Sequence, residues 1–438
     1  MTVLHDNHHA RSKPDPTGQH PAPSAAAPDL QRWPAMRRPR PAPARAALAR
    51  VLMRRVARQT GIHVAGPGGR GFGAPAPGRA PAAMGAPVLR VLDDEAFFTR
   101  LGRDGKIGFG EAFMAGDWDS DDLVAVLTPM ARQVGRLVPR RLQWLRRFYD
   151  AHHPAEEDND RRGASRNIAR HYDLSNELFA LFLDETMTYS SALFPDDAGT
   201  GTDLATAQAR KIERLLDQVG VRPGIRLLEI GTGWGELALR AARRGAHVTT
   251  VTLSLEQATL ARQRIAAAGL GSRVEVRVQD YRDVTGAFDA IVSVEMIEAV
   301  GERWWPTYFR TLDERLAPGG RIGLQAILMP HDRMLASRTS WTWIHKYIFP
   351  GGLIPSERAI NDAIAGHTAL HVVDRLHFGT SYAETLRRWR ERFTAQAAAV
   401  TAAGFDQTFQ RMWTFYLAYC EAGFRAGYLD VAQLTLGR

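Results

Sequence analysis

One glycine-rich segment has residue types and spacing that allow the backbone to approach a ligand closely. It reads Leu228-Glu229-Ile230-Gly231-Thr232-Gly233-Trp234-Gly235 and completes a short apolar run. Glycines at the end of a buried strand permit a tight turn and leave room beside the main chain. Two cofactors are bound by loops of this type, a dinucleotide and S-adenosylmethionine.

The residues around this loop favour S-adenosylmethionine over a dinucleotide. A dinucleotide site has the spacing G-x-G-x-x-G and an acidic residue about 20 positions further on. Here the third glycine comes one position early, and the next strand ends at Thr252-Leu253-Ser254 without an acid. Gln257, three residues after Ser254, could bind a ribose through its amide. The alternative is that Gln257 is an ordinary surface residue at the start of a helix.

Alternating strands and helices position this loop. Apolar runs predict strands at residues 225–230, 247–253, 274–278, 290–294 and 321–328, and helices at 237–244 and 255–268. This order predicts an α/β fold with a parallel, doubly wound sheet. The last 80 or so residues are expected to be helical, because they show a helical period. Their aromatic stripe is interpreted as core rather than as an acyl pocket; it comprises Phe405, Phe409, Met412, Trp413, Phe415, Tyr416 and Tyr419.

Charge is distributed unevenly over the 438 residues. The net charge is +9; residues 1–60 hold 11 basic and 3 acidic side chains, which leaves +1 for the rest. Nine of the 24 prolines lie in the first 45 residues, so residues 1–60 are expected to be a basic, largely disordered extension. Within it, residues 44–58 predict a basic helix with Leu48, Val51, Leu52 and Val56 on its apolar face. Such an extension suits a polyanion, either nucleic acid or an anionic lipid surface.

The remaining chain divides into two parts. Residues 61–150 are expected to form a small, mostly helical module, beginning with a Gly-Pro-Ala linker at 61–85, and residues 151–438 the catalytic domain. Basic and aromatic residues at 140–149 are a second candidate for contact with phosphate head groups; the alternative is an ordinary surface helix whose Trp and Leu face the core. The single cysteine, Cys420, excludes a disulfide scaffold and a cysteine-rich zinc site, and no metal site is expected around His171. Without a membrane span or a signal peptide, the expected compartment is the cytoplasm.

Several further motifs occur in a fixed order and together resemble the cyclopropane fatty acid synthase family. They are residues 170–176, Met187-Thr188-Tyr189-Ser190, residues 229–235, residues 252–257, Asp280-Tyr281-Arg282-Asp283 and residues 346–352. The resemblance runs from about residue 88 to the C-terminus. Members of this family use S-adenosylmethionine to alkylate the cis double bond of acyl chains in phospholipids. Residues 294–301 and 324–327 resemble most the branch that makes 10-methylene stearate, the precursor of tuberculostearic acid.

The resemblance implies a Rossmann-like class I methyltransferase sheet with a helical N-terminal module and a helical C-terminal cap. It also implies a set of cofactor-binding residues, which are Tyr189, Ser190, Gly231, Gly233, Thr252, Leu253, Gln257, Tyr281 and Arg282.

The family binds a bicarbonate ion as base, through a Cys, a Glu, a His, an Ile main chain and a Tyr. Glu298, Ile327 and Tyr382 match three of these positions, whereas Ser191 replaces the cysteine and Gln325 the histidine. Ser and Gln can form hydrogen bonds to an oxyanion but cannot act as thiolate or imidazole, so the use of bicarbonate stays open. Glu298 could instead be a surface carboxylate, and Tyr382 could cap a helix.

These residue types suit methyl transfer to an alkene. Transfer leaves a carbocation, which a carboxylate such as Glu298 and aromatic faces can stabilise. The aromatic candidates are Tyr281, Trp304, Trp341, Trp343 and Phe349. Immediate proton loss from the new methyl group closes a cyclopropane ring, whereas a preceding hydride shift gives a methylene branch.

The exchanges at Ser191 and Gln325 favour the methylene product, which a separate reductase would convert to a methyl branch. The alternatives are a cyclopropane synthase, a nucleic-acid methyltransferase and a catalytically silent binding protein. A nucleic-acid enzyme is disfavoured because the catalytic part is nearly neutral. Instead, we expect a peripheral enzyme on the inner face of an anionic membrane.

Overall fold

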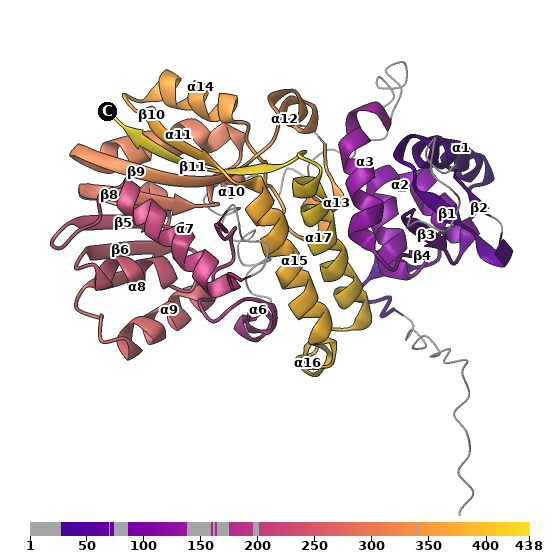
Figure 1. Ribbon diagram of the computed structural model, residues 1–438, viewed down its shortest axis with the longest axis horizontal. Helices are drawn as coiled ribbons and strands as arrows, with labels where there is room; N and C mark the ends of the chain where they lie inside the picture. The colour runs from indigo at the N-terminus through magenta and orange to yellow at the C-terminus, as the bar shows by residue number, and fades with distance from the viewer. Residues whose placement is uncertain are drawn as a thin grey trace, which may run out of the picture.

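The computed structural model describes residues 28–69, 71–73, 86–137, 159–160, 163, 175–195, 201–338 and 340–438. Its larger sheet has the strand order β10-β11-β9-β8-β5-β6-β7 (Figure 1). The strands are β5 (Arg226–Ile230), β6 (His247–Thr252), β7 (Val274–Val278), β8 (Phe288–Val294), β9 (Leu316–Leu328), β10 (His371–His377) and β11 (Asp430–Gly437). Strands β5 to β9 pair in parallel, and β11 is antiparallel to both of its neighbours. The α/β prediction and all five predicted strands are confirmed.

The expectation that the last 80 residues lack strands is wrong, because β10 and β11 complete the sheet. β11 lies between β9 and β10, so it is buried on both faces, and it includes the polar residues Gln433 and Thr435. Buried polar side chains interrupt the apolar run by which an interior strand is recognised. The signal in the sequence was therefore weak.

Helices cover both faces of this sheet. Successive residues of a strand point to opposite faces, and Leu227 and Leu228 of β5 accordingly belong to two different apolar clusters. One face carries α7 (Leu204–Gln218), α8 (Glu236–Arg243) and α9 (Leu255–Ala267), and the other carries α11 (Trp305–Arg315) and α14 (Glu357–His367). The short helix α10 (Ile297–Val300) follows β8. Each parallel strand therefore ends at the same edge, where the glycine-rich loop lies.

The N-terminal module is not purely helical. It contains α1 (Pro43–Thr60), α2 (Asp94–Ala115) and α3 (Leu123–Leu137). A four-stranded sheet, β2-β1-β3-β4, packs with them and comprises β1 (His63–Ala65), β2 (Gly71–Phe72), β3 (Val88–Val91) and β4 (Trp118–Asp119). Two of its strands lie in the segment that was expected to be a linker. They are only two and three residues long, too short to give a periodic signal.

Part of the expected disordered extension is folded, and it contacts both this module and the C-terminal part of the chain. Trp33 donates to Asp406 at 2.7 Å, and the buried Arg100 donates to the main-chain oxygen atoms of residues 35–37. The predicted helix forms, but its apolar face is assigned wrongly: Leu48 and Val51 are 52% and 60% exposed, and the small residues Ala46, Ala49 and Ala57 are buried instead with Met53. Small residues allow α1 to pack closely on α2. Residues 1–27 and 140–149 and His171 lie outside the described residues.

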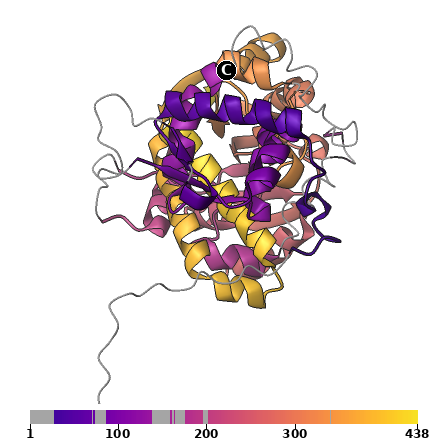
Figure 2. The same cartoon turned by 90° about the vertical axis from the view of Figure 1, so that its right-hand side faces the viewer.

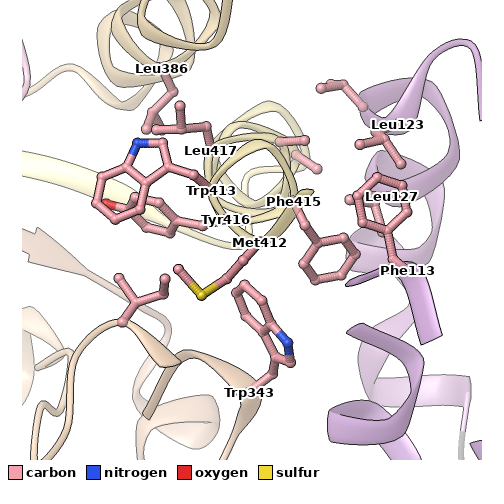
Figure 3. Close-up of a cluster of buried hydrophobic side chains, with 14 of the residues drawn as sticks. Phe113, Leu123, Leu127, Trp343, Leu386, Met412, Trp413, Phe415, Tyr416 and Leu417 are labelled. Carbon is pink, nitrogen blue, oxygen red and sulfur yellow. The ribbon is translucent and has the colours of Figure 1, made fainter. Parts of the chain in front are cut away.

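C-terminal helices lie between the module and the larger sheet (Figure 1). They are α15 (Gly379–Ala395), α16 (Ala397–Ala402) and α17 (Gln407–Arg425), with α6 (Asn176–Phe182) beside them. Figure 3 shows Met412, Trp413, Phe415 and Tyr416 of α17 inside this interface. Six of the seven stripe residues are buried, so the core interpretation is confirmed for them; Tyr419 is 43% exposed.

The module also contacts the segment that follows β9. This segment contains α12 (His331–Ser337) and α13 (Trp343–Tyr347). Trp343 packs against Phe415 with ring centroids 4.9 Å apart, and a Cβ on Gly110 of α2 would come within 2.5 Å of the Trp343 ring. Trp343 therefore serves to join the two parts. Among the described helices, none combines the length and the apolar character that crossing a bilayer requires.

Candidate active site

A pocket opens at the carboxyl ends of β5, β6 and β8, where doubly wound sheets bind ligands. Eight of the nine expected cofactor-binding residues line it: Tyr189, Ser190, Gly231, Gly233, Thr252, Leu253, Gln257 and Tyr281. The ninth, Arg282, is turned toward Asp280, with which it forms a buried ion pair at 2.6 Å, and its guanidinium lies 5.4 Å from the ring of Trp304. Arg282 therefore shapes the loop after β7 and does not line the pocket.

The glycine-rich loop has the conformation that its sequence indicates. Gly231, Gly233 and Gly235 have φ values of 97°, 52° and 88°, which other residues adopt only under strain. A Cβ on Gly231 would lie 2.8 Å from Met296, whereas a Cβ on Gly233 would meet nothing within 4 Å and would project into open space. Gly235 precedes α8, so the loop presents its backbone to the pocket at the start of a helix.

The interpretation of Gln257 as a surface residue is wrong, since it is only 6% exposed. Ser254 caps α9 by accepting a hydrogen bond from the main-chain N–H of Gln257. The Thr252 hydroxyl donates to Oε1 of Gln257 at 3.1 Å. The amide is thereby fixed at the end of β6, where an acidic residue stands in dinucleotide sites.

A second cluster forms around a carboxylate that the sequence analysis did not select. Glu295 follows β8 directly, and its Oε1 accepts hydrogen bonds from the main-chain N–H of Ser191 at 2.9 Å and from Nε2 of Gln325 at 2.8 Å. Its Oε2 accepts from the hydroxyl of Tyr382 at 2.8 Å. Three residues at positions where the family binds bicarbonate therefore hold the Glu295 carboxylate. The Ser191 hydroxyl does not take part, because it donates to the main-chain oxygen of Ala192.

The backbone of Glu295 is strained. Its φ of 51° lies in the left-handed region, which non-glycine residues seldom occupy. Such strain persists only where the surroundings impose it, and it concentrates at functional sites. The sequence did hold a signal, because Glu295 and Glu298 both follow the β8 strand at the ligand-binding edge. Of these two carboxylates, only Glu298 matches the family pattern.

Glu298 lies on α10, close to Glu295, and its carboxylate accepts fewer hydrogen bonds than that of Glu295. Its Oε1 accepts a hydrogen bond from the main-chain N–H of Ile327, and its buried Oε2 has no hydrogen-bond partner among the described residues. Burial, reinforced by the nearby charge of Glu295, raises the pKa of Glu298 to about 8. When two carboxylates share a site, their different surroundings separate their protonation states. Glu298 is thus the carboxyl that retains its proton near neutral pH.

Lys211 of α7 supplies a positive charge to this cluster. It is 1% exposed, and its Nζ donates to the Ser190 hydroxyl at 2.7 Å. Burial raises the pKa of Glu295 above its ordinary value, and the charge of Lys211 and the three hydrogen bonds oppose this rise by favouring the ionised form. Burial also lowers the pKa of Lys211 to about 8. Of the two carboxyl groups, Glu295 is the one whose ionised form is stabilised, and it faces the same pocket as the glycine-rich loop.

The strand order, the glycine-rich loop after β5 and the pocket at that loop define a class I methyltransferase fold. The model of the family "Mycolic acid cyclopropane synthetase" matches residues 159–434, and the chain belongs to this family. It is 54% identical over 423 residues to tuberculostearic acid methyltransferase UfaA1 of Mycobacterium tuberculosis, covering 95% of this chain and 97% of the relative. It is 34% identical to cyclopropane-fatty-acyl-phospholipid synthase of Escherichia coli over 80% of this chain and 87% of that enzyme.

Solved structures agree with this assignment. The mycolic acid cyclopropane synthase CmaA1, complexed with SAH and CTAB, superposes with a TM-score of 0.58 at 30% identity. The match covers 63% of this chain and 98% of CmaA1. The cyclopropane synthase MmaA2 from Mycobacterium tuberculosis gives 0.57 at 30% identity, with the same coverage. The resemblance inferred from the sequence motifs is therefore confirmed at the level of family and fold.

Proposed function

We propose that this protein transfers the methyl group of S-adenosylmethionine to the cis double bond of an unsaturated acyl chain in a phospholipid, giving a methylene-branched chain of the 10-methylene stearoyl type. The observation that carries the proposal is the Glu295 carboxylate, held by Ser191, Gln325 and Tyr382 at the cofactor pocket. The similarity to a tuberculostearic acid methyltransferase over nearly the whole chain supports the same product class.

The pocket residues bind and orient S-adenosylmethionine, and the bound cofactor supplies an electrophilic methyl group. As the alkene attacks, a C–C bond forms, the C–S bond breaks with its electron pair going to sulfur, and a carbocation remains on the chain. The ionised Glu295 stabilises this cation electrostatically. A hydride shift moves the positive charge to the methyl-bearing carbon. Glu295 then removes a proton from the new methyl group, and the C–H electron pair forms the C=CH2 double bond of the methylene branch.

Glu295 makes an added bicarbonate base unnecessary. Its carboxylate already occupies the hydrogen-bond donors of Ser191, Gln325 and Tyr382, so a second anion there would meet like charge and no free donor. Because this base is tied to the backbone after β8, it cannot move with the reacting carbon. We infer that this fixed position favours proton loss after the hydride shift rather than immediate ring closure.

We further propose that the enzyme works on the inner face of an anionic membrane, from the cytoplasm, and that α1 contacts the lipid. Figure 2 shows α1 across the outer end of the molecule. Its exposed residues include Leu48, Val51, Arg55 and Arg58, and α1 contains no acidic residue. Aliphatic side chains beside arginines suit an anionic bilayer surface. A separate reductase would then convert the methylene product to a methyl branch.

Double substitution of Leu48 and Val51 with serine tests the membrane contact. We expect weaker co-sedimentation with vesicles of phosphatidylglycerol and phosphatidylcholine, because two exposed aliphatic side chains are lost while the α1 core is retained. Leu255→Ser, at a residue 63% exposed on the catalytic domain, is the control. Equal vesicle binding by the double variant and the control would contradict a role of α1 in membrane contact.

Fatty-acid analysis tests the reaction itself. The protein is expressed in a host whose phospholipids carry oleoyl chains, and the methyl esters are separated by gas chromatography and identified by mass spectrometry. The expected result is a methylene-branched C19 ester that is absent without the protein. A dominant cyclopropane ester would instead make it a cyclopropane synthase, and unaltered oleate would contradict acyl methylation.

A further inference from the structure

Gln433, on the last strand, is linked through Gln325 to Glu295, the proposed base. Strand β11 pairs with β9 so that Gln433 lies directly across from Gln325. Both side chains are almost completely buried, at 1% and 0% exposure. The Nε2 of Gln433 donates to Oε1 of Gln325 at 3.1 Å, and Gln325 in turn donates to Glu295. The contact therefore extends from β11 to the carboxylate of the proposed base.

The orientation of both amides follows from groups that cannot reverse their roles. Arginine is only a donor, so Nη1 of Arg214, at 2.8 Å, must face Oε1 of Gln433. A main-chain carbonyl is only an acceptor, so the oxygen of Lys211, at 3.1 Å, must face Nε2 of Gln433. The second N–H of that amide then points at Oε1 of Gln325. Gln325 presents its own NH2 group to Glu295 and, at the longer distance of 3.3 Å, to the main-chain oxygen of Ser191.

Arg214 is itself fixed from the other side. Its Nη2 lies 2.7 Å from Asp374 of β10, and the Arg214 side chain is 21% exposed. A chain of hydrogen bonds thus leads from the Arg214–Asp374 ion pair through Gln433 and Gln325 to the buried carboxylate of Glu295, and each residue donates to the next. Since a reversed Gln325 would present a carbonyl oxygen, it could pair only with protonated Glu295.

We infer that Gln433 is a positioning residue of the methyltransferase, which, together with Arg214, sets the direction of the Gln325 amide and so keeps Glu295 able to accept a proton. The inference rests on the proposed role of Glu295 as base. Ionisable groups on three other elements also face Glu295: Lys211 on α7, Glu298 on α10 and Tyr382 on α15. None of them touches Gln433 through its side chain, so substitution of Gln433 leaves their contacts with Glu295 in place.

Two substitutions in the full-length protein test this inference. Gln433→Met retains the size of the side chain but removes the donor to Gln325. Gln433→Glu retains an acceptor for Arg214 but can only accept from Gln325, which reverses the Gln325 amide. Thr435→Val is the control, because Thr435 is a buried polar residue two positions along the same face of β11 and contacts Gln218 rather than Gln325.

The measurement is the pH dependence of kcat/KM for methylation of oleoyl phospholipid, together with Tm and S-adenosylmethionine affinity. In Gln433→Glu we expect the acid limb of this pH profile to move to higher pH by about one unit or more, since the reversed Gln325 amide no longer donates to the ionised base. In Gln433→Met the Gln325 N–H still has Glu295 and the Ser191 oxygen as acceptors, so we expect a smaller move in the same direction. Thr435→Val should keep the wild-type limb even if its Tm falls. A wild-type limb in both Gln433 variants would overturn the inference, whatever their stability. If Glu295→Asp leaves the acid limb of the pH profile unchanged, the assignment of Glu295 as the base is wrong, rather than the role of Gln433.

Discussion

Glu295→Gln is the substitution that separates the chemistry of the base from its geometry. Glutamine has nearly the shape of glutamate, and its oxygen can still accept from the Ser191 N–H and the Gln325 amide at the position of Oε1. Its new NH2 group would lie 2.8 Å from the Tyr382 hydroxyl, which can turn and accept. The variant therefore leaves no cavity, although the Tyr382 hydroxyl loses its acceptor, and its side chain can neither bear a charge nor take a proton.

The size of the effect follows from what is lost. A positioned general base contributes about 10²–10⁴-fold to rate, and Glu295 also provides the negative charge that faces the carbocation. We expect kcat to fall about 10³-fold, which corresponds to about 4 kcal/mol of transition-state stabilisation. The decrease should appear in kcat and kcat/KM alike, because the interaction forms only as the reaction proceeds. Affinity for S-adenosylmethionine should stay within about threefold of wild type, since no bond to the glycine-rich loop changes.

The assay follows transfer of a labelled methyl group into oleoyl phospholipid vesicles, with cofactor binding measured by calorimetry. Glu302→Gln is the matched control, because Glu302 lies in the same segment but pairs with Arg338 at 2.5 Å. It should retain wild-type turnover. A Glu295→Gln variant with undiminished kcat would refute the assignment of Glu295 as the base.

Three further predictions concern other parts of the site. Gly233→Val should abolish S-adenosylmethionine binding in calorimetry because the side chain would fill the pocket, whereas Gly269→Val, at an equally open left-handed glycine on the surface, should not; equal loss in both would point to unfolding. The folded-state pKa of Glu298 lies near 8, above the ~4.3 of an unfolded glutamate, so its contribution to stability is complete below about pH 4 and is lost as pH rises toward 8. Between about pH 4 and pH 8, the Tm of Glu298→Gln should therefore rise relative to the Tm of the wild type. If the two plots of Tm against pH stay parallel, the pKa of Glu298 is not raised. The double variant Ser191→Cys with Gln325→His should not change the cyclopropane fraction measured by gas chromatography, whereas adding Glu295→Gly to it should increase this fraction. An increase in the double variant alone would mean that Glu295 does not block a bicarbonate site.

The sequence predicted the parts of the fold that depend on local signals. Apolar runs and turns marked β5 to β9, and the loop at Gly231 could be assigned because positive φ angles require glycine there. The strands β10 and β11 give no clear strand signal, because β11 contains the buried polar residues Gln433 and Thr435 and β10 is an edge strand that pairs only with β11. For α1, the buried side proved to be the alanine side, since close packing on α2 selects small residues over large ones.

The cofactor site was easier to predict than the base site for the same reason. The eight pocket residues come from short stretches of sequence, at strand ends, loops and helix starts, that carry recognisable motifs. The environment of Glu295 instead depends on contacts between distant segments: Ser191, Gln325 and Tyr382 are 104, 30 and 87 positions away along the chain. Only the folded chain shows that these donors converge on one carboxylate and that Gln433 orients one of them.

Chemical rescue of Glu295→Gly is the most direct test of whether Glu295 replaces an added base. Glycine adopts the φ of 51° without strain, and its substitution leaves a space the size of a carboxylate between the Ser191 N–H, the Gln325 amide and the Tyr382 hydroxyl. Turnover of this variant is measured with increasing formate or bicarbonate, and with chloride at the same ionic strength. We predict that formate and bicarbonate restore methylation with saturation and that chloride does not. If S-adenosylmethionine still binds and neither anion restores turnover, Glu295 is not the base.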